Sequence, residues 1–98
     1  MGNEQRFAVE SNLMQALIHM LEAAAWPLSR EVPHWEAASK VFRSNGARRF
    51  SLSMRQWPDL AHIYRQALRG LPDTIDGQPP LPVPDACPVT LDELLSED

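Results

Sequence analysis

With 98 residues, 44% of them apolar, the chain has room for one small hydrophobic core and is too apolar for a disordered protein. Its formal net charge of −4 argues against an ordinary nucleic-acid-binding module, which is usually basic. The single cysteine excludes an intrachain disulfide framework, and no signal peptide or membrane span is visible. We therefore expect a cytoplasmic protein of one domain.

Residues 12–26 are the central element, because they contain neither Gly nor Pro and are rich in strong helix formers. Their apolar residues recur at three- and four-residue steps and form a broad arc, which consists of Leu13, Met14, Leu17, Ile18, Met20, Leu21, Ala24 and Ala25. The narrow polar stripe opposite consists of Gln15, His19 and Glu22. We predict a helix that begins near Glu4, with Asn3 as its N-cap, and ends at Trp26 because Pro27 follows. Such a helix needs covering elements on several sides.

A second helix is predicted after the loop of residues 27–32, with Pro33 at its first position. Its apolar face consists of Trp35, Ala38, Val41 and Phe42. The run Ser-Asn-Gly at residues 44–46 is typical of a helix end. An i, i+4, i+7 spacing of apolar residues then predicts a further short helix from Ala47 to Gln56, with Phe50, Met54 and Trp57 on one face.

A third helix is predicted from Pro58, which suits the first helical position, with Asp59 near the positive end of the helix dipole. Its amphipathic face consists of Leu60, Ile63, Tyr64, Ala67 and Leu68. Gly70, followed by Leu71 and Pro72, is a suitable helix end.

The six prolines from Pro72 to Pro88 exclude a regular helix or a central strand there. We predict an extended arm, partly polyproline II over residues 79–84. The proline run has two interpretations: it binds an aromatic groove on a partner, or it tethers the last helix, which we favour. Trp26, Trp35 and Trp57 are expected to seal the small core rather than to stack on bases.

The sequence Thr-Leu-Asp-Glu at residues 90–93 is a capping box, with Thr90 as the N-cap and Glu93 reaching back. It predicts a short terminal helix that docks on the bundle through Leu91, Leu94 and Leu95. The predicted fold is therefore an all-α single domain. Residues 1–70 form a helical bundle around the central helix, residues 71–89 the proline-rich arm, and residues 90–96 the capped terminal helix.

Charge is segregated along the chain. Residues 40–69 contain seven of the nine Lys and Arg residues and one acidic residue, whereas residues 70–98 contain seven acidic residues and no Lys or Arg. Phosphate contacts need long cations clustered on one exposed face. The candidate anion or nucleic-acid patch consists of Lys40, Arg43, Arg48, Arg49 and Arg55. The other interpretation is a solvated face, or internal pairing with the acidic tail.

Two further groups of residues are candidates for a metal site or a catalytic nucleophile. His19 and Glu22 lie one helical turn apart and would need His34 or His62 to complete a metal site. Neither a His-x-x-x-His nor a Cys-x-x-Cys spacing accompanies them, so a polar stripe between helices is favoured. Cys87 is interpreted as a small apolar anchor for the arm rather than as a nucleophile with a histidine as its base.

Several of these residues, in this order and spacing, resemble a family of small helical bacterial proteins, the domain of unknown function family twenty-nine. The resemblance covers roughly residues 13–95. The matching residues are His19, Leu21, Trp35, Pro58-Asp59-Leu60, Tyr64, Ala67 and, as the most specific part, the run from Cys87 to Leu95. The resemblance implies a helical fold, and it implies no agreed activity, cofactor or catalytic residue.

Family members usually begin with a further helical segment that is almost absent here. They also have Lys at the position of Glu22 and a shorter stretch between Trp35 and Pro58. Either the fold is complete without that first segment, or another chain fills its place.

We predict a non-catalytic, small cytoplasmic interaction or regulatory protein with no catalytic residue, metal or cofactor. A patch left exposed on the central helix would be covered by a second copy or a partner protein, so we expect a homodimer along that helix. The alternative is binding of nucleic acid or another polyanion through residues 40–69. An enzyme ranks third, and no membrane partner is expected.

Overall fold

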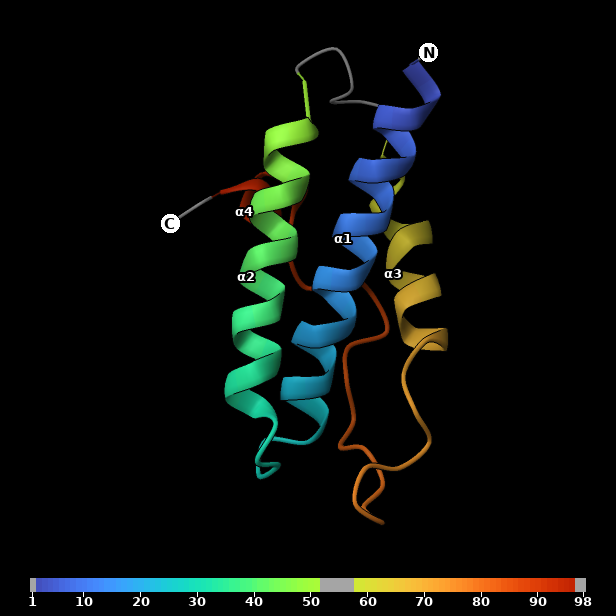
Figure 1. The fold of residues 1–98 in the computed structure, drawn as a ribbon. Helices are drawn as coiled ribbons and strands as arrows, with labels where there is room; N and C mark the ends of the chain where they lie inside the picture. The colour runs from blue at the N-terminus through green and yellow to red at the C-terminus, as the bar shows by residue number, and fades with distance from the viewer. Residues whose placement is uncertain (1, 52–57, 97–98) are drawn as a thin grey trace.

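The computed structural model describes residues 2–51 and 58–96 of the chain, with side chains from residue 6 onward in the first helix. This part is all-α, as predicted, and its helices are α1 (Gly2–Ala25), α2 (Val32–Arg49), α3 (Leu60–Arg69) and α4 (Leu91–Leu95). Figure 1 shows α1 in the middle, α2 and α3 on either side of it, and α4 behind α2. Helix α2 runs opposite to α1, whereas α3 runs in the same direction as α1.

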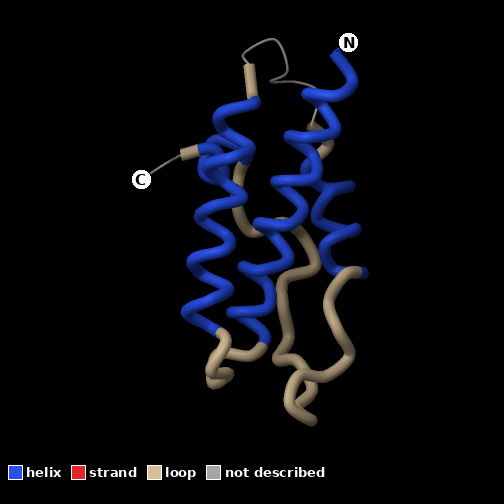
Figure 2. The backbone as a smooth tube through the Cα atoms, in the orientation of Figure 1, coloured by secondary structure: helices blue, strands red, loops and turns tan. Residues whose placement is uncertain are grey.

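The segment between α3 and α4, residues 71–89, is called the arm below. It contains no helix, turns at the lower end of the molecule and runs back alongside α1 to α4 (Figure 2). Hydrogen bonds to its backbone tie it to the helices: Leu81 N–H donates to Ala25 O (2.9 Å), Trp26 Nε1–H to Gln78 O (2.8 Å) and Tyr64 O–H to Pro84 O (2.6 Å). The first of these satisfies one of the terminal carbonyls of α1. The polyproline II conformation of residues 79–84 stays a prediction.

The main core lies where α1 and α3 meet the arm and α4. Its fully buried side chains are Val9, Leu13, Leu17, Leu21, Ile63, Tyr64, Ala67 and Leu94. The predicted apolar arc of the central helix is therefore buried by other parts of the same chain, and Ala24 is its exposed member. Leu91 and Leu95 pack against this core, which confirms the predicted docking of the terminal helix.

A second, smaller core closes the lower end of α1. Trp26, just after α1, and Trp35 of α2 are both buried there, and Ile75 and Val83 of the arm pack against them. The prediction that these two tryptophans seal the core is confirmed, whereas Trp57 lies outside the described residues.

A tight two-residue turn brings the arm to this second core. Ile75 and Gln78 exchange both backbone hydrogen bonds, at 3.0 and 2.9 Å, and the two residues between them, Asp76 and Gly77, have φ values of 52° and 77°. Positive φ at both central positions suits Asp-Gly, because Gly has no Cβ and Asp tolerates the left-handed region. The sequence analysis did not predict this turn.

The N-terminal boundary predicted for the central helix is wrong by two residues. Helix α1 begins at Gly2, so Asn3 lies inside the helix rather than at its N-cap. The predicted end is confirmed to within one residue, because α1 ends at Ala25. Pro33 takes the second rather than the first position of α2.

The predicted end of the second helix at residues 44–46 is wrong, because α2 continues through Gly46 to Arg49. A Cβ built on Gly46 would lie 3.5 Å from Asn12 Cβ and 3.6 Å from a methyl carbon of Leu13, so the glycine is buried where α2 crosses α1. Packing against α1 therefore keeps the helix intact at a residue that usually ends one.

The separate helix predicted from Ala47 to Gln56 is also wrong in its first part. Ala47, Arg48 and Arg49 belong to α2, and Phe50 is its C-cap with extended backbone. Residues 52–57 lie outside the described residues.

The starts of the last two helices show how capping residues set boundaries. Helix α3 begins at Leu60 rather than Pro58, because the Asp59 carboxylate accepts the N–H of His62 at 3.1 Å and makes Asp59 the N-cap. The predicted end at Gly70 is confirmed. The capping box of α4 is also confirmed, since the Thr90 and Glu93 side chains each accept the other's backbone N–H.

Replacing Gly46 with Ala is expected to stabilise the fold. The added methyl group meets Asn12 and Leu13 at ordinary van der Waals distance, and it removes the cost of a glycine inside a helix, which is about 0.5–1 kcal/mol. Urea denaturation of both proteins measures the change in the free energy of unfolding. A decrease in that free energy would show that α1 and α2 approach more closely than described.

Candidate functional site

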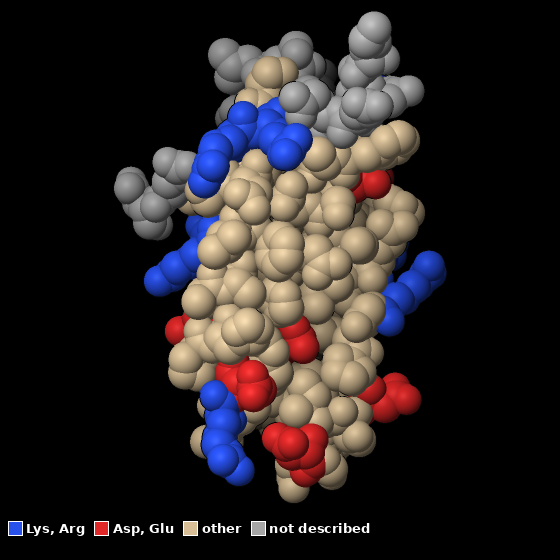
Figure 3. Space-filling view, viewed as in Figure 1, with Lys and Arg blue, Asp and Glu red and all other residues tan. Residues whose placement is uncertain are grey.

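The basic residues singled out in the sequence differ in their exposure. Lys40, Arg48 and Arg49 are exposed on α2, Arg43 is half-buried, and Arg55 lies outside the described residues. In Figure 3 Lys and Arg side chains gather over the upper end of α2, while the middle of this face carries few charges. Of the described members of this set, Arg48 and Arg49 line a common hollow, together with Asn12 and Asn45.

Arg43 holds the terminal helix instead of facing solvent. Its guanidinium donates to the carbonyl oxygens of Glu93 (2.8 Å), Leu94 (3.1 Å) and Ser96 (3.3 Å). These carbonyls lie at the C-terminal end of α4, where a cation is favourable and the helix has unsatisfied acceptors. This arginine therefore pairs with backbone of the acidic tail rather than remaining available to an anion.

The His19 imidazole is held inside the polar stripe. Its Nδ1 lies 2.8 Å from Glu22 Oε1, and its ring stacks on Phe42 of α2 with the centroids 5.7 Å apart. His34 and His62 are exposed. Within residues 2–51 and 58–96, no three His, Cys, Asp or Glu side chains gather where they would hold a metal ion.

Cys87 is a free, half-buried thiol that packs against the main core. Its Sγ–H donates to Val89 O at 3.3 Å, a contact within the arm itself. This placement agrees with the interpretation of Cys87 as an apolar anchor. The nearby Tyr64 is buried, and burial, followed by the charges of Cys87 and Asp85, raises the pKa of Tyr64 above its ordinary value near 10.

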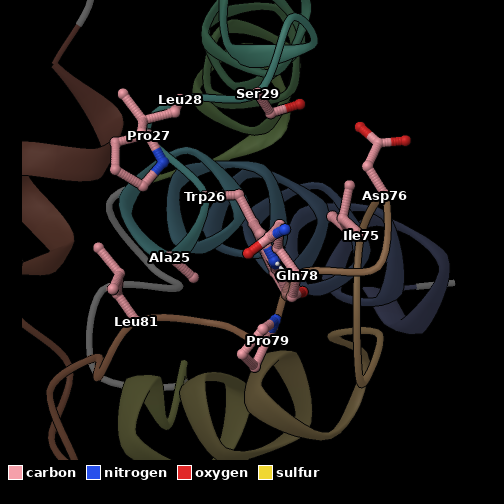
Figure 4. Close-up of a pocket in the computed structure, with 10 residues that line it drawn as sticks. All are labelled: Ala25, Trp26, Pro27, Leu28, Ser29, Ile75, Asp76, Gln78, Pro79 and Leu81. Carbon is pink, nitrogen blue, oxygen red and sulfur yellow. Dashed lines mark hydrogen bonds between the residues drawn. The ribbon is translucent and has the colours of Figure 1, made fainter.

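An apolar hollow lies at the lower end of the molecule, between the loop after α1 and the turn of the arm (Figure 4). It has a volume of about 250 Å³ and is lined by Ala25, Trp26, Pro27, Leu28, Ser29, Ile75, Asp76, Gln78, Pro79 and Leu81. The side chain of Leu28 is 97% exposed and that of Leu81 is 53% exposed. This end of the molecule therefore offers large apolar side chains to solvent around a concave surface. We call it the apolar hollow.

The walls of the apolar hollow are fixed by hydrogen bonds. The Trp26 indole N–H donates to Gln78 O, as the dashed line in Figure 4 shows, and Ser29 N–H donates to Trp26 O at 3.1 Å. The turn at residues 75–78 and the bond from Leu81 N–H to Ala25 O fix the other wall. The backbone on both sides of the apolar hollow is thus fixed by contacts within the chain.

Sequence reasoning missed the apolar hollow. Leu28 lies in the predicted loop of residues 27–32, and nothing in its neighbours indicates whether a loop leucine turns inward or outward. One signal was present: Asp76-Gly77 is a turn dipeptide inside the arm, and it predicts a reversal at that point. That reversal forms one wall of the apolar hollow.

The fold defines a small all-α protein with a helical hairpin, a third helix and a returning arm. The whole chain, residues 1–98, matches the model of the family described as Domain of unknown function DUF29, and the protein belongs to this family. The resemblance seen over roughly residues 13–95 is thereby confirmed and extended. No curated protein and no solved structure matches the chain significantly. No helix in the described part of the chain is long and apolar enough to cross a membrane.

Replacing Tyr64 with Phe is expected to lower the free energy of unfolding by about 1 kcal/mol near neutral pH, because the hydrogen bond to Pro84 O is lost. Since the pKa of Tyr64 is raised on folding, its neutral form stabilises the native state below about pH 10, and this contribution is lost as the pH rises through the folded pKa. Urea denaturation of both proteins near neutral pH and well above pH 10 measures the difference. The difference should shrink in alkali. A difference that stays constant or grows would contradict the assignment.

Proposed function

We propose that this protein is a non-catalytic interaction module of the cytoplasm that binds a partner protein through the apolar hollow. The observation that carries the proposal is the 97% exposure of Leu28 at the rim of a preformed apolar concavity. An apolar patch that stays in solvent is typical of a protein-binding site. Each Å² of apolar surface that a partner removes from water contributes about 25 cal/mol.

The size of the apolar hollow suits one large apolar side chain. Its volume of about 250 Å³ is just below that of ordinary ligand pockets, and its lining is mostly apolar. A Leu, Phe or Trp side chain of a partner would contact Trp26, Leu28 and Leu81 at once. The occupant we propose is therefore an apolar side chain carried by a peptide segment.

Charge favours a basic peptide around that side chain. The exposed charged residues of the two segments that frame the apolar hollow are Arg30, Glu31, Asp73 and Asp76, one basic against three acidic. The arm itself contains no Lys or Arg. Lys or Arg beside the apolar side chain would complement this rim, whereas a second copy of the chain would bring the same acidic rim against it.

The placement of other reactive groups supports a non-catalytic role. Cys87 packs on the core, His19 is engaged with Glu22 and Phe42, and neither lines the apolar hollow. The free thiol of Cys87 supports a reducing compartment such as the cytoplasm.

The homodimer expected along the central helix stays a prediction without a supporting observation. It depended on an exposed apolar arc, and in the structure this arc packs on α3, the arm and α4. We therefore place the binding surface at the end of α1 rather than along it.

Panning a random-peptide library against the immobilised protein tests the proposal. Enriched peptides should share a Leu, Phe or Trp beside Lys or Arg, and Leu28→Ser should weaken their binding about ten-fold or more, because a buried leucine contributes about 1.5–3 kcal/mol. Fluorescence titration of a labelled consensus peptide measures the affinities. Since Leu28 is almost fully exposed, its replacement should change the free energy of unfolding by less than about 0.5 kcal/mol.

The matched control is Val41→Ser, which removes another exposed apolar side chain, 57% exposed, from α2. It should leave peptide binding unchanged. Failure to enrich any peptide, or equal binding by the wild type and Leu28→Ser, would contradict the proposal.

A further inference from the structure

A polar hollow lies at the opposite end of the molecule from the apolar one. It has a volume of about 360 Å³, and the described residues that line it are Asn12, Asn45, Arg48 and Arg49. We call it the polar hollow. These four described residues supply two cations and two amides.

The fold builds the polar hollow from two helices. Asn45 and Arg48 are three residues apart on α2 and so share one face of its last turns, with Arg49 next to them. Asn12 comes from α1 and lies where the two helices cross, since a Cβ built on Gly46 would be 3.5 Å from Asn12 Cβ. The Asn12 amide donates to Ala8 O at 2.7 Å, which fixes its orientation and leaves it a second N–H.

The two arginines of the polar hollow differ from Arg43 in their contacts with the described residues. Neither Arg48 nor Arg49 forms a hydrogen bond or an ion pair with the described residues, and both are exposed. Arg43, by contrast, donates hydrogen bonds to the carbonyl oxygens at the end of α4. Two forked guanidinium groups beside amide N–H donors therefore face solvent from one concave surface, which is the chemistry that recognises an oxyanion.

We propose that the polar hollow binds a single phosphate group. A phosphate dianion offers enough oxygens to accept from both guanidinium forks and from Asn45 together, and its charge matches that of the two arginines. A nucleic-acid backbone fits less well, because the described residues of the polar hollow bring just two cations together. The site offers two charges in one place rather than a long basic surface.

Titration of the isotope-labelled protein with inorganic phosphate, followed by nuclear magnetic resonance, tests this site. The side-chain N–H signals of Asn45, Arg48 and Arg49 should shift together and saturate. Arg48→Gln combined with Arg49→Gln should raise the dissociation constant for phosphate about ten-fold or more, since hydrogen bonds to charged groups are lost. The matched control is Arg65→Gln with Arg69→Gln, which removes two exposed charges from α3. It should change the dissociation constant for phosphate by less than about two-fold, because charges far from the polar hollow act on it weakly through screened long-range interactions.

Two parallel titrations distinguish the source of the group. If phosphoserine binds as well as inorganic phosphate, the site accepts a phosphorylated side chain. If inorganic phosphate binds and phosphoserine does not, the site is restricted to the free ion. Both outcomes support the proposal. Absence of saturable shifts, or equal loss in both double variants, would overturn it. An oligonucleotide that shifts these signals while phosphate does not would overturn it in favour of nucleic-acid binding.

Discussion

The need to cover α1 on several sides determines the rest of this structure. Its apolar residues extend around most of the helix, and one short chain must remove them from water. Helix α2 covers one side, α3 another, and the arm with α4 the remaining side. A proline-rich segment can serve as that cover because it is already restricted before folding, so less conformational entropy is lost on ordering it.

The arm can cover α1 because polar groups of its backbone form hydrogen bonds with other parts of the chain. An extended segment has no internal ladder, so its polar groups need water or other elements. Leu81 N–H meets the last carbonyl of α1, the Trp26 indole reaches Gln78 O, and the Tyr64 hydroxyl reaches Pro84 O. Arg43 then fixes α4 at the far end of the arm. The buried side chains of Trp26 and Tyr64 thus do two things: their rings pack in the core, and their polar groups hydrogen-bond to the backbone of the arm.

The chain itself covers most of the apolar surface of α1, with Phe7 as an exception at 65% exposed, and the two candidate binding surfaces lie at the ends of the molecule. The apolar hollow forms where the loop after α1 meets the turn of the arm, and the polar hollow forms where α2 ends beside α1. Each lies beside a local feature of the packing. The apolar hollow adjoins the tight turn at Asp76-Gly77, and the polar hollow adjoins the crossing of α1 and α2 at Gly46.

Local signals in the sequence predicted much of the fold. The apolar periodicity of α1 and α3, the capping box at Thr90 and the end at Gly70 depend on neighbouring residues, so they could be read directly. The predictions differ from the structure where residues far apart in the sequence determine the local conformation or contacts. Gly46 remains helical because α1 packs on it, and the sequence could not reveal that Arg43 donates to carbonyls of α4, about fifty residues later. The exposure of Leu28, on which the proposed function depends, is likewise set by the whole fold.

Native-state hydrogen exchange at the Leu81 amide tests the central claim, that the arm is an integral cover of α1. The Leu81 side chain is half exposed, so slow exchange of its amide would have to come from the hydrogen bond to Ala25 O. We expect this amide to exchange about as slowly as that of Leu17 in the middle of α1. Exchange at the rate of an unstructured peptide, while Leu17 stays protected, would contradict the account.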